Sequence, residues 1–294
     1  MTDPAHSDAL LPQQIAPADD LQCRLTEDCL SARTEVLMAY FLALRREVDK
    51  VLSARLPAAA GKPYPYGRCE EITREVYARL GQRLRTPHEP VERLLADFVS
   101  RGGIARTVWG VLREQYFQNA LQFGALYIDV SNDTVVVSKP PVEILPMASS
   151  GLVNVQDLAH FRQTAERYWG ATLYANHLVP TLAPLLPMVS VSPGRLQPGL
   201  QSACDYMIGL MCRDGFAQAE QWLQAGPPPP PELTQRLLAA TPADLQPWTS
   251  QGGVEAVMAC RRARAAGGHL SADWRQARLL DYLRSLQGPA GQAS

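Results

Sequence analysis

The stretch Tyr64-Pro65-Tyr66-Gly67-Arg68-Cys69 ends where a helix is predicted to begin. Two prolines and a glycine favour an extended arm followed by a bend. From Cys69 onwards, apolar residues recur every four positions, at Ile72, Val76, Leu80 and Leu84. This spacing puts them on one face of an amphipathic helix. Glu70 and Glu71 would lie in its first turn, where carboxylates favour the positive end of the helix dipole.

The same stretch contains the main candidate for chemistry, the thiol of Cys69. Unpaired backbone N–H groups at a helix start and a neighbouring arginine, Arg68, both favour thiolate over thiol. We therefore expect Cys69 to be partly ionised and nucleophilic. The alternative is a small buried residue that packs at a helix start, because free cysteine is among the most buried residue types.

Around this helix, the periodicity predicts a mainly α fold with a helical bundle-like body. Further helices are expected over about 27–55, 90–100 and 104–123. One short antiparallel β-hairpin, of two or three strands, is predicted near residues 125–146. Its strands would be 125–130 and 134–138, joined by Asn132 and Asp133 in a turn, with a third at 142–145.

In the second half of the chain, helices are expected over about 155–178 and 200–224, then at 232–240, 253–266 and 271–286. An uninterrupted proline run from Pro227 to Pro231 predicts an extended spacer. The expected organisation is a disordered lead (1–20), a main helical domain (21–225), the spacer (226–231) and a small C-terminal helical region (232–294). That last region is either separate or part of the same domain.

A catalytic set around Cys69 can be assembled only in part. A cysteine at a helix start is similar to the arrangement in papain-like and transglutaminase-like enzymes. In transglutaminase-like folds, strands that supply a histidine and then an acid follow that helix. Asp129 could orient a base in that arrangement. The polar residues near the predicted hairpin, Gln118 and Asn119, cannot take a proton from a thiol, so we do not assign the chain to either family. His88 is the histidine nearest to Cys69 in sequence, with His160 and His177 as alternatives.

Aromatic residues in the first half could line a cleft beside Cys69. The candidates for substrate binding are Tyr64, Tyr66, Arg68 and Tyr127. The alternative is an aromatic core whose hydroxyl groups reach its rim.

Neither a metal site nor a cofactor site is expected. Glu166 and His177 are eleven residues apart, too far along a helix to share one ion. The glycines form no phosphate-binding loop and no nucleophile elbow. The six cysteines show no repeated spacing, which argues against disulfide bonds.

The composition limits the classes of partner that this protein is expected to bind. A hydrophobic content of 46% is enough for a core, and a net charge of -1 gives no attraction to nucleic acid or to an anionic membrane. No signal or membrane-spanning segment is recognised, so a cytoplasmic location is expected, with leaderless secretion as an alternative. Only Lys50, Lys62 and Lys139 are lysines, which suggests a GC-rich bacterial genome.

Two hypotheses on function follow. The first is a thiol-dependent enzyme that carries out acyl-transfer or hydrolase chemistry at Cys69, on a small molecule or a protein. The second is a non-catalytic helical interaction protein, such as an adaptor, an effector or an assembly factor.

Overall fold

The computed structural model describes residues 14–56, 58, 61–193, 199–200 and 205–287. The chain divides into two compact units, Met1–Val155 (unit 1) and Gln156–Ser294 (unit 2). The run Pro227–Pro231, predicted as a spacer, lies within unit 2. Residues 1–13 of the predicted disordered lead are outside the described residues, whereas residues 14–19 run up to the N-cap of the first described helix.

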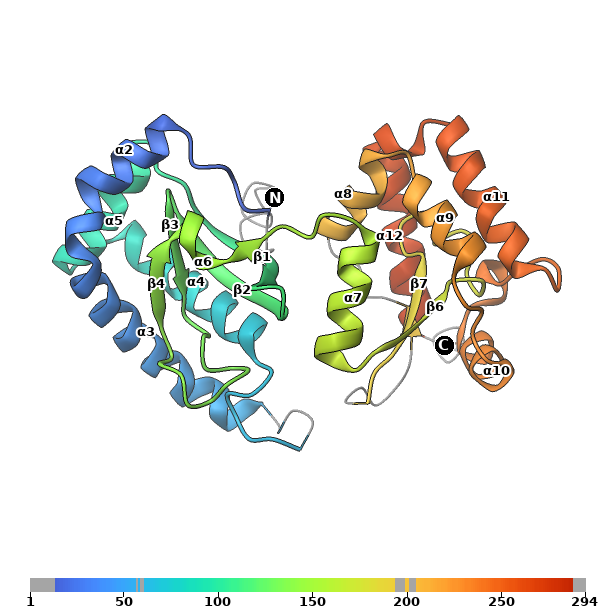
Figure 1. Ribbon diagram of the computed structural model, residues 1–294, viewed down its shortest axis with the longest axis horizontal. Coiled ribbons are helices and arrows are strands. Elements are labelled where there is room, and N and C mark those ends of the chain that lie inside the picture. The colour runs from blue at the N-terminus through green and yellow to red at the C-terminus, as the bar shows by residue number, and fades with distance from the viewer. Residues whose placement is uncertain (1–13, 57, 59–60, 194–198, 201–204, 288–294) are drawn as a thin grey trace. The chain divides into compact units, whose positions relative to one another are not determined.

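Unit 1 combines four longer helices with a curled antiparallel sheet (Figure 1). The helices are α2 (Asp20–Cys29), α3 (Thr34–Arg55), α4 (Cys69–Arg85) and α5 (Pro90–Ser100). The strands are β1 (Ala105–Leu112), β2 (Tyr116–Phe123), β3 (Leu126–Asp129), β4 (Glu143–Pro146) and β5 (Leu152–Val153), in the order β4-β3-β2-β1-β5. A short helix, α6 (Met147–Ser150), connects β4 to β5.

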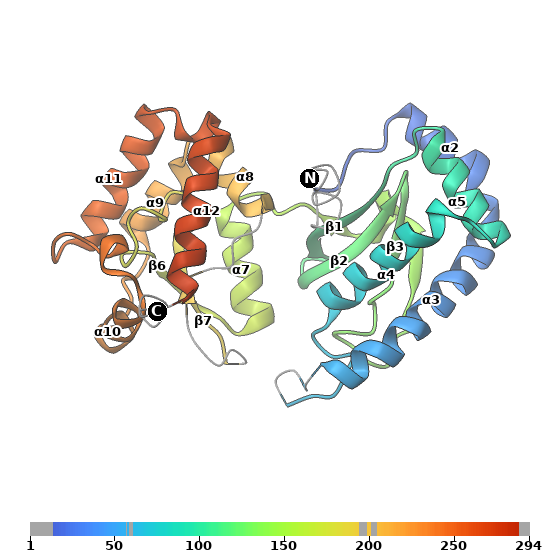
Figure 2. The ribbon, with the colours of Figure 1, turned by 180° about the vertical axis from the view of Figure 1, so that it is seen from behind.

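The core of unit 1 lies between the helices and one face of this sheet. Helices α3 and α4 lie against that face (Figure 2). Apolar residues at every second position of β2 and β3 point to them, including Leu121, Phe123 and Ile128. The predicted helical stripe of Ile72, Val76 and Leu80 is buried in the same core, so the prediction for α4 is confirmed.

The prediction of a mainly α fold is wrong, because residues 104–123 form a β-hairpin and not a helix. Strands β1 and β2 pair over their whole length, from Ala105 opposite Phe123 to Leu112 opposite Tyr116. The three-residue loop between them, 113–115, begins with a β-turn in which the Gln115 N–H donates to the Leu112 carbonyl at 3.0 Å. Arg113 and Glu114, at the centre of this turn, have positive φ, 52° and 55°, a conformation usually taken by Gly, Asn or Asp. Without those residues in the sequence, the turn gave no signal.

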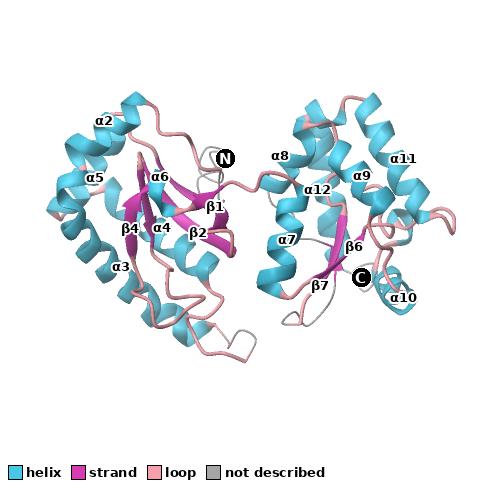
Figure 3. Ribbon diagram, in the orientation of Figure 1, coloured by secondary structure: helices cyan, strands magenta, loops and turns pink. Residues whose placement is uncertain are grey.

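The predicted hairpin near 125–146 is also different. Strand β3 is present, but residues 134–138 form turns and bends instead of a strand. Strand β3 pairs instead with β2 on one side and with β4 on the other, with Tyr127 opposite Gln122 and Leu145. The fold is therefore mixed α/β, with a five-stranded sheet in unit 1 (Figure 3).

Unit 2 packs helices around a three-stranded antiparallel sheet, in the order β6-β7-β8. The strands are β6 (Thr172–Ala175), β7 (Met188–Val191) and β8 (Gly199–Leu200). The helices are α7 (Leu158–Trp169), α8 (Asp205–Arg213), α9 (Ala217–Ala225), α10 (Pro231–Ala240), α11 (Gly252–Ala265) and α12 (Ala272–Gln287).

The helices predicted for unit 2 are partly confirmed. Those expected at 232–240, 253–266 and 271–286 correspond to α10, α11 and α12. The helix expected over 155–178 ends at Trp169, because Gly170 adopts a left-handed conformation, φ 58°, and β6 follows. Residues 201–204 of the helix expected over 200–224 are outside the described residues, and the rest of that range contains two helices, α8 and α9, separated by Gly215 and Phe216 at positive φ. Among the described residues, no helix has both the length and the apolar composition needed to cross a bilayer.

Candidate functional site

Cys69 is the first residue of α4, as predicted. The loop before it is held by the segment that follows β3, because the Gly67 N–H donates a hydrogen bond to the Thr134 carbonyl at 2.8 Å. Gly67 has φ 69°, a left-handed conformation that explains a glycine at this bend. The thiol therefore has a fixed position between α4 and β2.

The pKa of the Cys69 thiol is raised, whereas the sequence predicted a lowered one. Burial raises the pKa of Cys69 to about 11, and the charges of Asp129 and Glu71 add to the increase. Arg68 does not offset them, because its Nη1 forms an ion pair with Glu71 Oε1 at 2.7 Å. The prediction of a lowered thiol pKa is wrong, since desolvation of the sulfur outweighs the helix start.

The side chain that contacts the sulfur is Asn119, from the middle of β2. Its Nδ2 donates a hydrogen bond to Sγ at 3.5 Å. Its backbone carbonyl accepts hydrogen bonds from Thr73 Oγ1, at 3.3 Å, and from Ser131 Oγ, at 3.2 Å. A carboxamide can donate to the sulfur but cannot act as a general base. Asn119 thus occupies the place in which thiol catalysis requires a proton acceptor.

Asp129 lies on the other face of the sheet from Asn119. It shares a face with Tyr127, two residues earlier, and Tyr127 pairs with Gln122, which faces away from the helices. The carboxylate accepts four hydrogen bonds: from Tyr127 Oη (2.9 Å), Gln118 Nε2 (2.8 Å), and the N–H (2.8 Å) and Oγ (3.1 Å) of Ser131. Burial raises the pKa of Asp129 to about 6, although these hydrogen bonds oppose the increase. Its described partners are therefore structural groups, and none of them is an imidazole.

One of the three candidate histidines, His88, belongs to the same unit as Cys69 and lies far from it along the chain. His88 follows the far end of α4, a helix of 17 residues that is about 25 Å long. Its backbone N–H donates to Glu92 Oε2 at 2.8 Å, in the capping box of α5. His160 and His177 belong to unit 2. Within the described part of unit 1, His88 is the only histidine.

Of the four residues proposed for substrate binding, Tyr64, Tyr66 and Arg68 lie in the loop before Cys69, whereas Tyr127 lies in β3. Tyr64 donates a hydrogen bond to Asp49, and the ring of Tyr66 lies 4.1 Å from Lys62 Nζ. Arg68 pairs with Glu71, and Tyr127 is fully buried on the face of Asp129. Tyr127 is thus on the opposite sheet face from Asn119, the residue that contacts Cys69.

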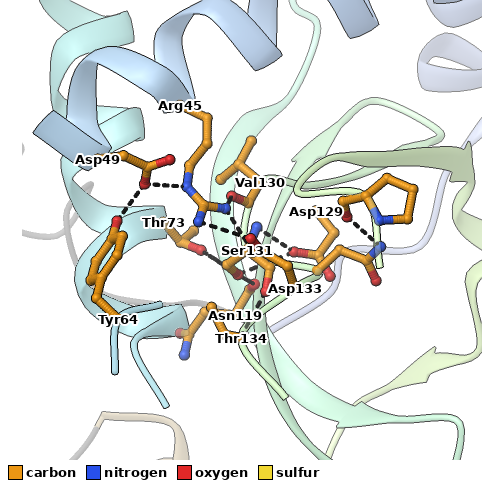
Figure 4. Close-up of polar contacts among 12 residues, drawn as sticks. Arg45, Asp49, Tyr64, Thr73, Asn119, Asp129, Val130, Ser131, Asp133 and Thr134 are labelled. Carbon is orange, nitrogen blue, oxygen red and sulfur yellow. Dashed lines mark hydrogen bonds and ion pairs between the residues drawn. The ribbon is translucent and has the colours of Figure 1, made fainter. Parts of the chain in front are cut away.

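A buried polar centre, which the sequence did not reveal, surrounds Arg45 of α3 and includes Asp49, Val130 and Asp133 (Figure 4). Arg45 is 1% exposed. Its guanidinium binds both carboxylate oxygens of Asp133, at 2.9 and 3.2 Å, and also Asp49 Oδ1 at 2.6 Å and the Val130 carbonyl at 2.7 Å. Asp133 was predicted to stabilise a hairpin turn, but it serves this ion pair. The only sequence signal was the position of Arg45 on the buried stripe of α3, four residues after Phe41.

The network of Arg45 supports the thiol site. It fixes the segment from Val130 to Thr134, which in turn holds Gly67, next to Arg68 and Cys69.

Among the described residues there is no group of three or more metal-ligating side chains, and the described cysteines are free. Comparison with protein-family models, with curated proteins and with solved structures found no match to this chain.

Proposed function

We propose that this protein is a non-catalytic interaction protein in which the thiol site of unit 1 is chemically silent. The observation that carries the proposal is the contact between Asn119 and Cys69. The group within reach of the sulfur is a carboxamide, and burial keeps the thiol protonated at neutral pH. Nucleophilic catalysis needs a thiolate or an adjacent base, and this arrangement supplies neither.

Unit 2 supports a binding role with an exposed aromatic side chain on an ordered loop. Trp248 is 90% exposed. The loop is fixed by Glu255 of α11, whose carboxylate accepts hydrogen bonds from the N–H groups of Trp248, at 2.9 Å, and Thr249, at 2.7 Å. Tryptophan is enriched at protein interfaces, and a pre-ordered loop loses little entropy on binding.

A thiol-dependent acyltransferase or hydrolase is the second candidate. The supporting observation is that Cys69 is only half-buried at the N-terminal end of a long helix. A reagent or a substrate could therefore reach the residue. This candidate requires a base that the described residues of unit 1 do not place beside the sulfur.

The two candidates are separated by peptide-resolved labelling of the intact protein with iodoacetamide between pH 6 and 10. Cys23 is exposed and free, so it is an internal reference in the same sample. A silent site predicts that Cys69 is labelled more slowly than Cys23 at every pH and that its rate is still rising above pH 9. Labelling of Cys69 that reaches its plateau below pH 7, and that is lost in Cys69→Ser, would instead establish a reactive thiolate.

A further inference from the structure

Residues Ile15 and Ala16 are bound through their main chain by two side-chain amides of unit 1. The Ala16 N–H donates to Gln122 Oε1 at 3.0 Å, and Gln122 Nε2 donates to the Ala16 carbonyl at 2.7 Å. The Ile15 N–H donates to Asn154 Oδ1 at 2.9 Å, and Asn154 Nδ2 donates to the Ile15 carbonyl at 3.3 Å. Each amide therefore satisfies both main-chain groups of one residue.

The two amides hold the segment from both of its edges. In an extended chain, the N–H and C=O groups of successive residues point in opposite directions. Gln122 comes from β2 and Asn154 follows β5, and these strands lie on either side of β1 in the sheet. The pair reproduces the hydrogen bonds that two neighbouring strands would offer to an extended peptide.

The Gln122 amide is already oriented for this role. Its side chain is fully buried, and Nε2 also donates to the Gly124 carbonyl at 3.0 Å, which fixes its rotamer. It lies on the face of the sheet away from the helical core, because its neighbours Leu121 and Phe123 point into that core. With the segment bound, Oε1 accepts the Ala16 N–H and Nε2 donates to the Ala16 and Gly124 carbonyls, so the polar atoms of this buried amide are satisfied.

We propose that Gln122 and Asn154 form a binding site for the main chain of an extended peptide of a partner protein. The chain's own Gln14–Pro17 segment is its resident occupant, which the partner displaces. All four hydrogen bonds join neutral side-chain amides to main-chain N–H and C=O groups, so the site would recognise a peptide backbone and not a charged group. The inference rests on the binding role proposed above and names the class of partner.

The test uses the full-length chain with Ile15→Pro and Ala16→Pro, which removes the two N–H donors and releases the segment. The probe is a fluorescent peptide with the sequence of residues 13–18, Gln-Gln-Ile-Ala-Pro-Ala, followed by fluorescence anisotropy. We expect the released variant to bind it at least tenfold more tightly than the wild-type protein, in which the resident segment competes. Adding Asn154→Asp to the released variant should weaken binding at least tenfold, because a carboxylate cannot donate to the peptide carbonyl.

Three outcomes would overturn the proposal. The first is no binding by a released variant that keeps the circular dichroism spectrum of the wild type. The second is binding that does not depend on Asn154, or that a Gln-Gln-Pro-Pro-Pro-Ala peptide reproduces. The third is a wild-type dimer that the peptide dissociates, since the natural occupant would then be the segment of a second copy.

A second measurement keeps the test decisive if the released variant does not fold. Excess peptide added to the wild-type protein should accelerate hydrogen exchange at the Ile15 and Ala16 amides, whereas unchanged exchange at saturating peptide contradicts displacement. Failure of these experiments would remove the peptide site alone, because the silent thiol is tested separately by labelling of Cys69.

Discussion

Arg45 and Asp133 lie 88 residues apart in the chain and form a two-pronged ion pair in the interior of unit 1, with N–O distances of 2.9 and 3.2 Å. A guanidinium and a carboxylate make two parallel hydrogen bonds in this geometry, which fixes orientation as well as distance. The pair connects α3 to the segment after β3 and thereby to the loop that leads into Cys69. Four predictions follow from this centre, from the thiol site and from unit 2.

Replacement of Arg45 by methionine should lower the free energy of unfolding by about 3–5 kcal/mol, because Asp133 would keep a buried charge without its partner. Denaturant unfolding followed by circular dichroism measures this loss. The matched control is Arg46→Met at the adjacent exposed position, where a change within about 0.5 kcal/mol is expected. Equal effects of the two substitutions would show that the buried pair has no special role.

Replacement of Asn119 by histidine should lower the pKa of the Cys69 thiol, because an imidazole would replace the amide that now contacts the sulfur. Iodoacetamide labelling of Cys69 at pH 7 should increase at least tenfold relative to the exposed Cys23. Asn119→Gln, which keeps an amide, is the control and should leave labelling slow. An unchanged rate in the histidine variant would mean that this position cannot place a base at the thiol.

The stability of the protein should depend on pH through Asp129. The folded-state pKa is raised from 3.8 to about 6, so the folded protein binds more protons than the unfolded chain between these values. This group therefore makes its full contribution below pH 4, and the contribution is lost as the pH rises to 6. The maximum change is roughly 3 kcal/mol, at about 1.4 kcal/mol for each pH unit.

Asp129→Asn removes this titration, so the difference in unfolding free energy between wild type and variant should change between pH 4 and 6 and stay constant from pH 7 to 8. Using the difference removes the contribution of other carboxylates. Glu92 and Glu220, for example, have lowered pKa values and act in the opposite direction. A difference that is constant over the whole range would contradict the raised pKa.

The proline run of unit 2 should behave as a packed element rather than as a free spacer. The Pro227 carbonyl accepts a hydrogen bond from the Ala175 N–H at 2.8 Å, and Pro229 is buried whereas Pro228 is exposed. Pro229→Gly should thus cost at least about 1 kcal/mol more than Pro228→Gly in thermal or denaturant unfolding, because both lose the same chain rigidity but only one loses packing. Equal losses at the two positions, together with proteolytic cleavage between Gln224 and Thr234, would support the spacer.

Local sequence patterns predicted α4, α5 and the last three helices well and the sheet poorly. The four-residue spacing of Ile72, Val76 and Leu80 identified α4, and Pro90 marked the start of α5. The β1–β2 hairpin was missed because its turn uses Arg113 and Glu114 at positive φ. Strand β2 is buried on both faces, so the apolar and polar alternation that marks a half-exposed strand is weak there.

For the candidate site too, some features followed from the local sequence and others only from the tertiary structure. The position of Cys69 at the start of a helix was evident from the sequence, because caps, bends and periodicity are local properties. The protonation of the thiol, the placement of Asn119 beside it and the burial of Arg45 with Asp133 were decided only by the tertiary structure. A pKa depends on desolvation and on charges brought together from distant parts of the chain, and no pattern along a single helix or strand contains that information.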